Sequence, residues 1–158
     1  MTRVPPTYSI AELEALATLE FASLSTDEAV TLGLVAFEVI QERDLSLAVD
    51  VVIHGDLVFR AKLKSTGPDN DPWLRGKSNV ALGFGEPSLL VRQRHIEAGT
   101  AFEDRTDIDH DQMRAFGGSV PLRVAGSIIG TLTVSGEPDA IDHETAVEAI
   151  ERYLRGHT

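Results

Sequence analysis

The chain has 158 residues, 42% of them hydrophobic and 25% charged, which are the proportions of one globular domain rather than of a disordered or membrane protein. Its formal net charge of −11 and the lack of a basic run disfavour nucleic acid and anionic membranes as partners. The absence of cysteine excludes disulfides, thiolate nucleophiles and cysteine-based zinc sites. We expect a single domain over residues 1–158 that stays in the cytoplasm, because neither a signal pattern nor an apolar run of about 20 residues is found.

Two capping boxes predict the first two helices. Ser9 and Ser25 each precede a glutamate by three residues, the spacing at which the two side chains cap each other's backbone. The second helix should run to about Arg43, and its apolar residues on nearly all sides indicate burial. Gly33 lowers helix propensity in its middle, so we expect another element to pack closely there.

Residues 47–53 and 57–63 alternate between apolar and polar side chains, which predicts a β-hairpin. A three-residue loop would set Ile53 opposite Leu57 and Val51 opposite Phe59, with the large apolar groups on one face. A two-residue turn would slip the register by one, and is rejected on that ground.

Residues 120–124 and 128–134 predict a second hairpin, again with a three-residue loop. With a loop of this length, the alternation of side chains puts Ile128 on the apolar face, and Ile129 on the opposite face with two threonines. Pro121 cannot donate to a sheet ladder, so its strand should lie at an edge.

Between and after the hairpins, Pro72–Phe84 and Pro87–Ala98 should be helical, residues 100–118 form an acidic irregular segment, and Asp142 caps a last helix. The fold class is therefore α+β: an antiparallel sheet of two hairpins, with four to five strands and flanking helices that cover one face.

Four motifs in order carry a resemblance to a known family. They are Gly67-Pro-Asp-Asn-Asp-Pro-Trp-x-Arg-x-Lys-x-Asn79, Gly117-Gly-x-x-Pro-Leu122, Val134-Ser-Gly136 and Asp142-His143. The chain resembles the GlcG/HbpS-like, or haem-degrading-domain, superfamily, and within it a subgroup of short bacterial and fungal proteins. The resemblance implies a profilin-like sheet, a homo-oligomer and, since some relatives bind or degrade haem, haem as a possible cofactor. Phe116 stands where the subgroup usually has histidine, and Gly76 where it tends to have a cation.

The first motif has two interpretations. Asp71 before Pro72 is typical of a helix N-cap, and Asp71 can pair with Arg75 one turn later. Arg75 and Asn79 share one helix face, whereas Lys77 points roughly the other way. The cations could bind a carboxylate-bearing ligand, but a structural or interface role is favoured, with Trp73 and Arg75 at a subunit contact.

Metal binding finds little support. Asp107–Asp111 starts like a calcium-binding EF-hand loop, but its sixth position is Gln112 and its twelfth is Gly118. No two histidines have metal-site spacing. His95 and His143 are the candidates for an axial haem ligand, although a structural role is commoner for such residues; His143, in a first helical turn, should be neutral.

We expect a homo-oligomer that binds a small ligand, either haem or another carboxylate-bearing molecule. The alternative is a scaffold or interaction protein whose motifs serve assembly. An enzyme is least favoured, because no catalytic motif is visible. Gly117-Gly118 could bind an anion through its backbone or simply form a turn. The candidate ligand-binding residues are Arg75, Lys77, Asn79, Gly117, Gly118 and His143.

Overall fold

The computed structural model describes residues 3–156, which contain one four-stranded antiparallel sheet in the order β2-β1-β4-β3. Each hairpin contributes two neighbouring strands, so the predicted α+β class and the sheet of two hairpins are confirmed. The strands are β1 (Ala48–Ile53), β2 (Asp56–Lys62), β3 (Ser119–Val124) and β4 (Ser127–Ser135).

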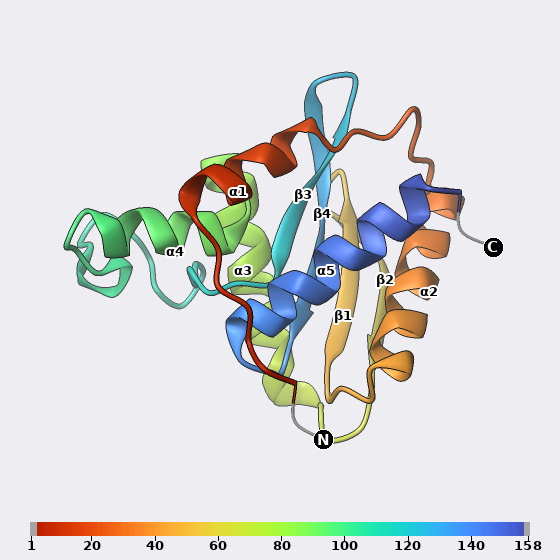
Figure 1. Ribbon diagram of the computed structural model, residues 1–158, viewed down its shortest axis with the longest axis horizontal. Helices are drawn as coiled ribbons and strands as arrows, with labels where there is room; N and C mark the ends of the chain where they lie inside the picture. The colour runs from red at the N-terminus through yellow and green to blue at the C-terminus, as the bar shows by residue number, and fades with distance from the viewer. Residues whose placement is uncertain (1–2, 157–158) are drawn as a thin grey trace.

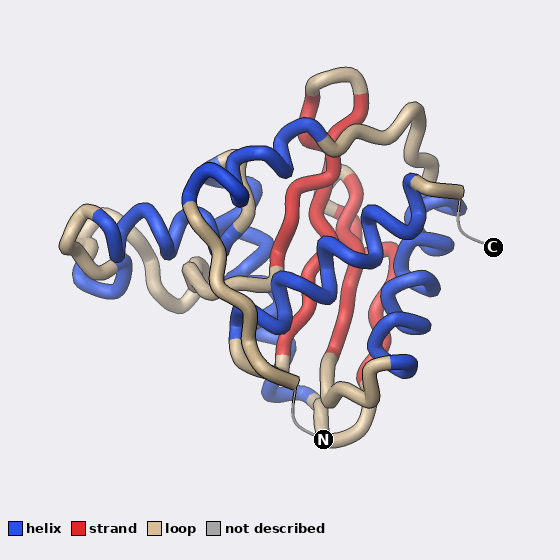
Figure 2. The backbone as a smooth tube through the Cα atoms, in the orientation of Figure 1, coloured by secondary structure: helices blue, strands red, loops and turns tan. Residues whose placement is uncertain are grey.

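The helices lie on both faces of this sheet, so the prediction that one face would be covered is wrong (Figures 1 and 2). Two of them, α2 and α5, cover one face, α3 lies on the other, and α4 extends away from the sheet. The segment after α4 turns back to the sheet, where Gly117 contacts the start of α5 and Gly118 contacts β4. None of the described helices is long and apolar enough to cross a membrane. The helices are α1 (Ile10–Glu14), α2 (Thr26–Glu42), α3 (Asp71–Phe84), α4 (Ser88–Glu97) and α5 (Asp139–Leu154), with 3-10 turns at Ala15–Thr18, Pro68–Asn70 and Phe102–Asp104.

The helix starts were predicted with mixed success. Both capping boxes form, at Ser9 and at Ser25. The predicted caps Asp71 and Asp142 are wrong. A 3-10 turn runs directly into α3 and makes Asp71 its first residue, while α5 begins three residues before Asp142. Neither carboxylate caps its helix, and each instead pairs with a cation from another part of the chain, Asp71 with Lys62 and Asp142 with Lys77.

The first hairpin corrects the predicted loop. Ile53 pairs with Asp56 across a two-residue turn, in which His54 and Gly55 have φ of 50° and 79°. A β-bulge at Val58 then restores the predicted pairing of Val51 with Phe59. The two-residue turn had been rejected because it shifts the strand register by one residue. The bulge adds one residue to β2 and cancels that shift, so the short turn is compatible with the apolar face.

The second hairpin repeats this arrangement. Its turn is Ala125-Gly126, with φ of 51° and 79°, and the bulge falls at Ile129. Ile129 consequently packs against the main core, and Ile128 lies across from Arg123 near Gly85. The predicted faces of the two isoleucines were therefore exchanged. The edge position of the strand with Pro121 is confirmed.

The main core lies between the sheet and the α2/α5 layer. A Cβ atom added to Gly33 would lie 2.4 Å from Cδ1 of Phe59, so this glycine lets α2 approach β2, as predicted. The core is formed by buried apolar residues, including Leu32, Val35, Ile40, Val49, Val51, Leu122, Leu132, Val134, Ile141 and Ile150.

The opposite face of the sheet is polar although it is buried. The hydroxyl groups of Ser78 and Thr131 lie 2.6 Å apart, and those of Ser119 and Thr133 lie 2.9 Å apart. Buried hydroxyls are tolerated when they bond to each other. The first pair ties α3 to β4, and the second ties β3 to β4.

Candidate functional site

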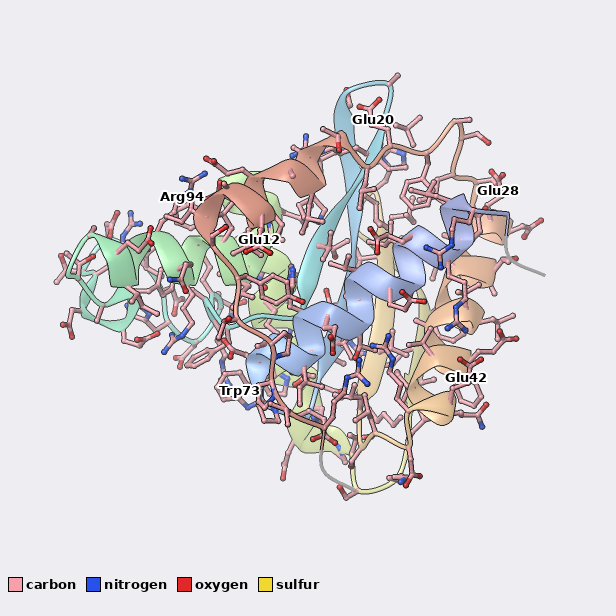
Figure 3. All side chains as sticks on the ribbon, viewed as in Figure 1. Glu12, Glu20, Glu28, Glu42, Trp73 and Arg94 are labelled. Atoms are coloured by element: carbon pink, nitrogen blue, oxygen red, sulfur yellow. The ribbon has the colours of Figure 1, made fainter. Side chains whose placement is uncertain are left out.

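A pocket of about 410 Å³ opens where the beginning of α3 meets the loop between β4 and α5. Figure 3 shows Trp73 beside the first turn of α5. We call this cavity the main pocket. Its lining residues are Asn70, Trp73, Lys77, Phe116, Ser135, Gly136, Glu137, Pro138, Asp139 and Asp142.

A buried ion pair forms one wall of the main pocket. The Nζ atom of Lys77 lies 2.8 Å from Oδ2 of Asp142 and 3.0 Å from the carbonyl oxygen of Val134, and both charged side chains are almost fully buried. Burial raises the pKa of Asp142 to about 6, against the lowering effect of the Lys77 ammonium. Two of the three ammonium N–H groups are used, and the third has no acceptor among residues 3–156.

Two aromatic rings form the opposite wall. Trp73 and Phe116 meet edge to face, with ring centroids 5.4 Å apart, and we call them the aromatic wall. Arg92 lies over the Phe116 ring at 4.1 Å and Arg114 over the Trp73 ring at 4.4 Å. Each ring thus holds a guanidinium group by a cation–π contact.

Gly76 explains how Arg114 reaches this position. The backbone N–H of Arg114 donates to the Gly76 carbonyl at 3.1 Å, and a Cβ on Gly76 would lie 2.7 Å from the Arg114 Cγ. Any side chain at position 76 would therefore displace Arg114 from Trp73. Position 76, where the family resemblance would place a cation, is thus covered by the Arg114 side chain.

Of the two predicted glycines, Gly118 lies beside the ion pair and Gly117 beside Asp139, and neither is among the lining residues of the main pocket. The N–H of Gly117 donates to the Asp139 carboxylate at 3.1 Å. Gly118 has φ of 137°, and a Cβ there would lie 2.3 Å from the Val134 oxygen and 3.0 Å from the Lys77 Nζ. Gly118 thereby permits Lys77 to lie against β4.

Arg75 and Asn79 lie outside the main pocket, on the far side of α3 from Lys77. The Asn79 amide donates to the Gln112 carbonyl at 2.7 Å and ties the 100–118 segment to α3. Arg75 is exposed, and its guanidinium has no hydrogen bond or salt bridge within residues 3–156. The expected salt bridge from Asp71 goes instead to Lys62 at 2.8 Å and Arg60 at 3.2 Å.

His143 is fully buried and does not line the main pocket. In the described part of the chain neither ring nitrogen has a hydrogen-bond partner, and Tyr8 packs edge to face against the ring at 4.9 Å. Burial lowers the pKa of His143 to about 4, despite nearby Asp139 and Glu144. This lowered pKa agrees with the predicted neutral side chain, and its main cause is desolvation.

A second, smaller cavity lies on the other side of the aromatic wall. This Phe102 pocket has a volume of about 170 Å³. Arg114, Phe116 and His110 were not predicted as site residues, because residues 100–118 have no periodic pattern. The lining residues are Trp73, Phe102, Glu103, His110, Met113, Arg114 and Phe116.

The main pocket does not fit a haem held by its iron. Of the described residues around it, none is a histidine, cysteine, methionine or tyrosine, the usual axial ligands. His143 is sealed beneath Tyr8, and Phe116 replaces the histidine that the resemblance would place there. A tetrapyrrole could contact this pocket through its ring faces and carboxylates instead.

Comparison of this sequence with known proteins supports the family that the motifs indicate. A model of the family described as "Haem degrading protein HbpS-like" matches residues 24–151. A UPF0303 protein of Streptomyces coelicolor is 38% identical over 156 residues, which cover 98% of this chain and 99% of the relative.

Two solved structures share the fold. The Ybr137w protein has a TM-score of 0.85 at 22% identity, covering 95% of this chain and 90% of that one. A complex of PduOC with haem has a TM-score of 0.69 at 21% identity, covering 82% and 94%. At these identities the likeness establishes the fold alone. The family match over most of the chain, together with the close relative, shows that this chain belongs to the HbpS-like family of haem-degrading proteins.

Proposed function

We propose that the protein binds a planar, conjugated small molecule with carboxylate groups, such as a tetrapyrrole, in the main pocket. The observation that carries this proposal is the aromatic wall facing a buried ammonium that retains one free N–H. Aromatic rings hold flat conjugated ligands by stacking, and a buried ammonium favours a carboxylate. The volume of about 410 Å³ lies within the usual range for ligand pockets.

The acidic residues around the pocket are partly engaged by the protein itself. Glu137 accepts the backbone N–H of Ser46 at 2.9 Å, and Asp139 accepts that of Gly117 at 3.1 Å. Asp142 accepts N–H groups from Gly136 and Glu137 as well as the Lys77 ammonium. These bonds reduce the repulsion that an incoming carboxylate meets.

Haem is one candidate ligand, because the family is named for it and because the similar PduOC fold is described in complex with it. Since the main pocket offers no usual axial ligand, we expect binding through the porphyrin ring and its carboxylates. Haem and metal-free protoporphyrin IX should then bind with similar affinity.

The test uses Trp73, the single tryptophan of the chain, as an internal probe. Haem and protoporphyrin IX are titrated at micromolar concentration, and Trp fluorescence and the porphyrin absorption band are recorded. We expect both ligands to quench Trp73, and Phe116→Ala to weaken both about tenfold, since stacking contributes about 1 kcal/mol or more. Arg75→Ala is the matched control outside the pocket. Absence of quenching by either porphyrin, or of any ligand-induced rise in melting temperature across a panel of carboxylates, contradicts the proposal.

A second proposed role is assembly with further copies of the chain. It is supported by Arg75, which is exposed without a salt bridge in the described residues, and by Trp73, which is 37% exposed. Tryptophan and arginine are the residues most enriched at interface hot spots. Light scattering of the wild type and of the Trp73→Ala, Arg75→Ala variant tests this. A wild-type monomer, or an unchanged oligomer in the variant, argues against it.

A further inference from the structure

The Phe102 pocket is separate from the main pocket and has its own chemistry. Three aromatic rings line it, those of Trp73, Phe102 and Phe116, and its volume is about 170 Å³. Apolar protein cavities of about 150 Å³ bind benzene. A tetrapyrrole is far too large for this space, whereas a single six-membered ring fits it.

The pocket contains a cation without a counter-ion. The Arg114 guanidinium makes no hydrogen bond or salt bridge within residues 3–156, and its contact is the face of Trp73. Its neighbours differ, because Arg92 pairs with Glu103 and Arg105 pairs with Asp107. Its planar fork is suited to a carboxylate.

The other polar groups of this pocket do not neutralise Arg114. Glu103 bonds to Arg92 at 3.3 Å, and 51% of its side chain is exposed to solvent. His110 Nε2 lies 2.8 Å from the carbonyl oxygen of Arg105, which can only accept, so Nε2 carries the proton in the neutral ring. The pocket therefore combines an aromatic interior with one positive charge whose hydrogen-bonding groups are unused.

We propose that the Phe102 pocket is a second binding site, for a single-ring aromatic carboxylate of the size of benzoate. The ring packs among Trp73, Phe102 and Phe116, and the carboxylate accepts hydrogen bonds from the Arg114 guanidinium. This site does not depend on the proposed function of the main pocket, because the two ligands differ in size and in the cation that each meets.

The test compares benzoate with benzamide, its neutral isostere, by isothermal titration calorimetry on the wild-type protein. We expect benzoate to bind at least about tenfold more tightly, because a charge-assisted bidentate contact is lost with the amide. Nuclear Overhauser effects from the benzoate protons to the Phe102 ring and the Met113 methyl group, which line this pocket and not the main pocket, should place the ring at this site. Neither measurement requires a variant, so a folding defect cannot obscure the result.

Variants then identify the cation. Arg114→Gln should weaken benzoate about tenfold or more, and Arg75→Gln, which removes an equally unpaired charge outside the pocket, should leave it unchanged. A melting temperature measured for each variant checks that it folds. Equal affinities for benzoate and benzamide, no binding at millimolar benzoate, or an equal loss in Arg75→Gln would overturn the proposal. Porphyrin binding in Arg114→Gln reports on the main pocket separately.

Discussion

The face of the sheet under α2 and α5 buries almost only apolar side chains, whereas the face under α3 buries paired hydroxyls and ends in an ion pair. Apolar burial stabilises a fold in proportion to area, but a buried charge costs free energy unless a partner offsets it. We infer that the α2/α5 side contributes most of the free energy of unfolding, while the α3 side holds polar groups in fixed orientations. The proposed ligand sites lie at α3 for this reason.

The largest expected effect comes from breaking the ion pair. Lys77→Ala leaves the Asp142 carboxylate buried without its counter-ion and should lower the free energy of unfolding by about 3–5 kcal/mol, measured by urea denaturation. The double variant Lys77→Met, Asp142→Asn should recover most of this loss, because no uncompensated charge remains. A single variant as stable as wild type would show that the pair is not buried.

A smaller effect concerns pH, since two buried groups titrate in opposite directions. Burial raises the pKa of Asp142 from 3.8 to about 6, so between these values the folded state binds more protons and stability falls as pH rises. Burial lowers the pKa of His143 from 6.5 to about 4, so between these values the unfolded state binds more protons and stability rises with pH. The two slopes should nearly cancel between pH 4 and 6.

Single variants should reveal the two slopes. In that range Asp142→Asn should leave a stability that rises with pH, and His143→Leu one that falls with pH, each by up to about 1.4 kcal/mol per pH unit. Denaturation curves at several pH values between 4 and 7 measure this. Parallel pH profiles in the two variants would contradict the assignment.

The smallest effect tests the hydroxyl pairs of the polar face. Ser78→Ala leaves the buried Thr131 hydroxyl without its partner and should cost about 1–2 kcal/mol. Ser78→Ala with Thr131→Val removes both hydroxyls and should be nearly as stable as wild type. If the double variant instead loses more than the single one, the polar face contributes net stability and differs less from the apolar face than we infer.

Much of the local structure could be predicted because short-range interactions decide it. Ser9 and Ser25 cap their helices through residues three positions away, and period-two alternation places the strands. The errors arose where one extra residue in a strand reverses which face of the sheet the following side chains take. The bulges at Val58 and Ile129 do this, and they permit the two-residue turns that the hydrophobic pattern had ruled out.

The candidate site was predicted only in part. Of the residues predicted to bind a ligand, Lys77 lines the main pocket, whereas Arg75 and Asn79 of the same motif face away from it. Trp73, predicted at a subunit contact, also lines this pocket. Phe116 and Arg114 belong to a segment without periodicity, where a sequence pattern offers no positional information.

The sequence by itself determined the family, the α+β class and the residue types from which a site could be made. The tertiary structure alone decided which of these residues meet. Lys77 and Asp142 are 65 positions apart, and their pairing follows from α3 and α5 packing against the same end of β4. Arg114 reaches Trp73 only because Gly76 has no side chain to displace it. Such contacts depend on packing in three dimensions, which no local pattern encodes.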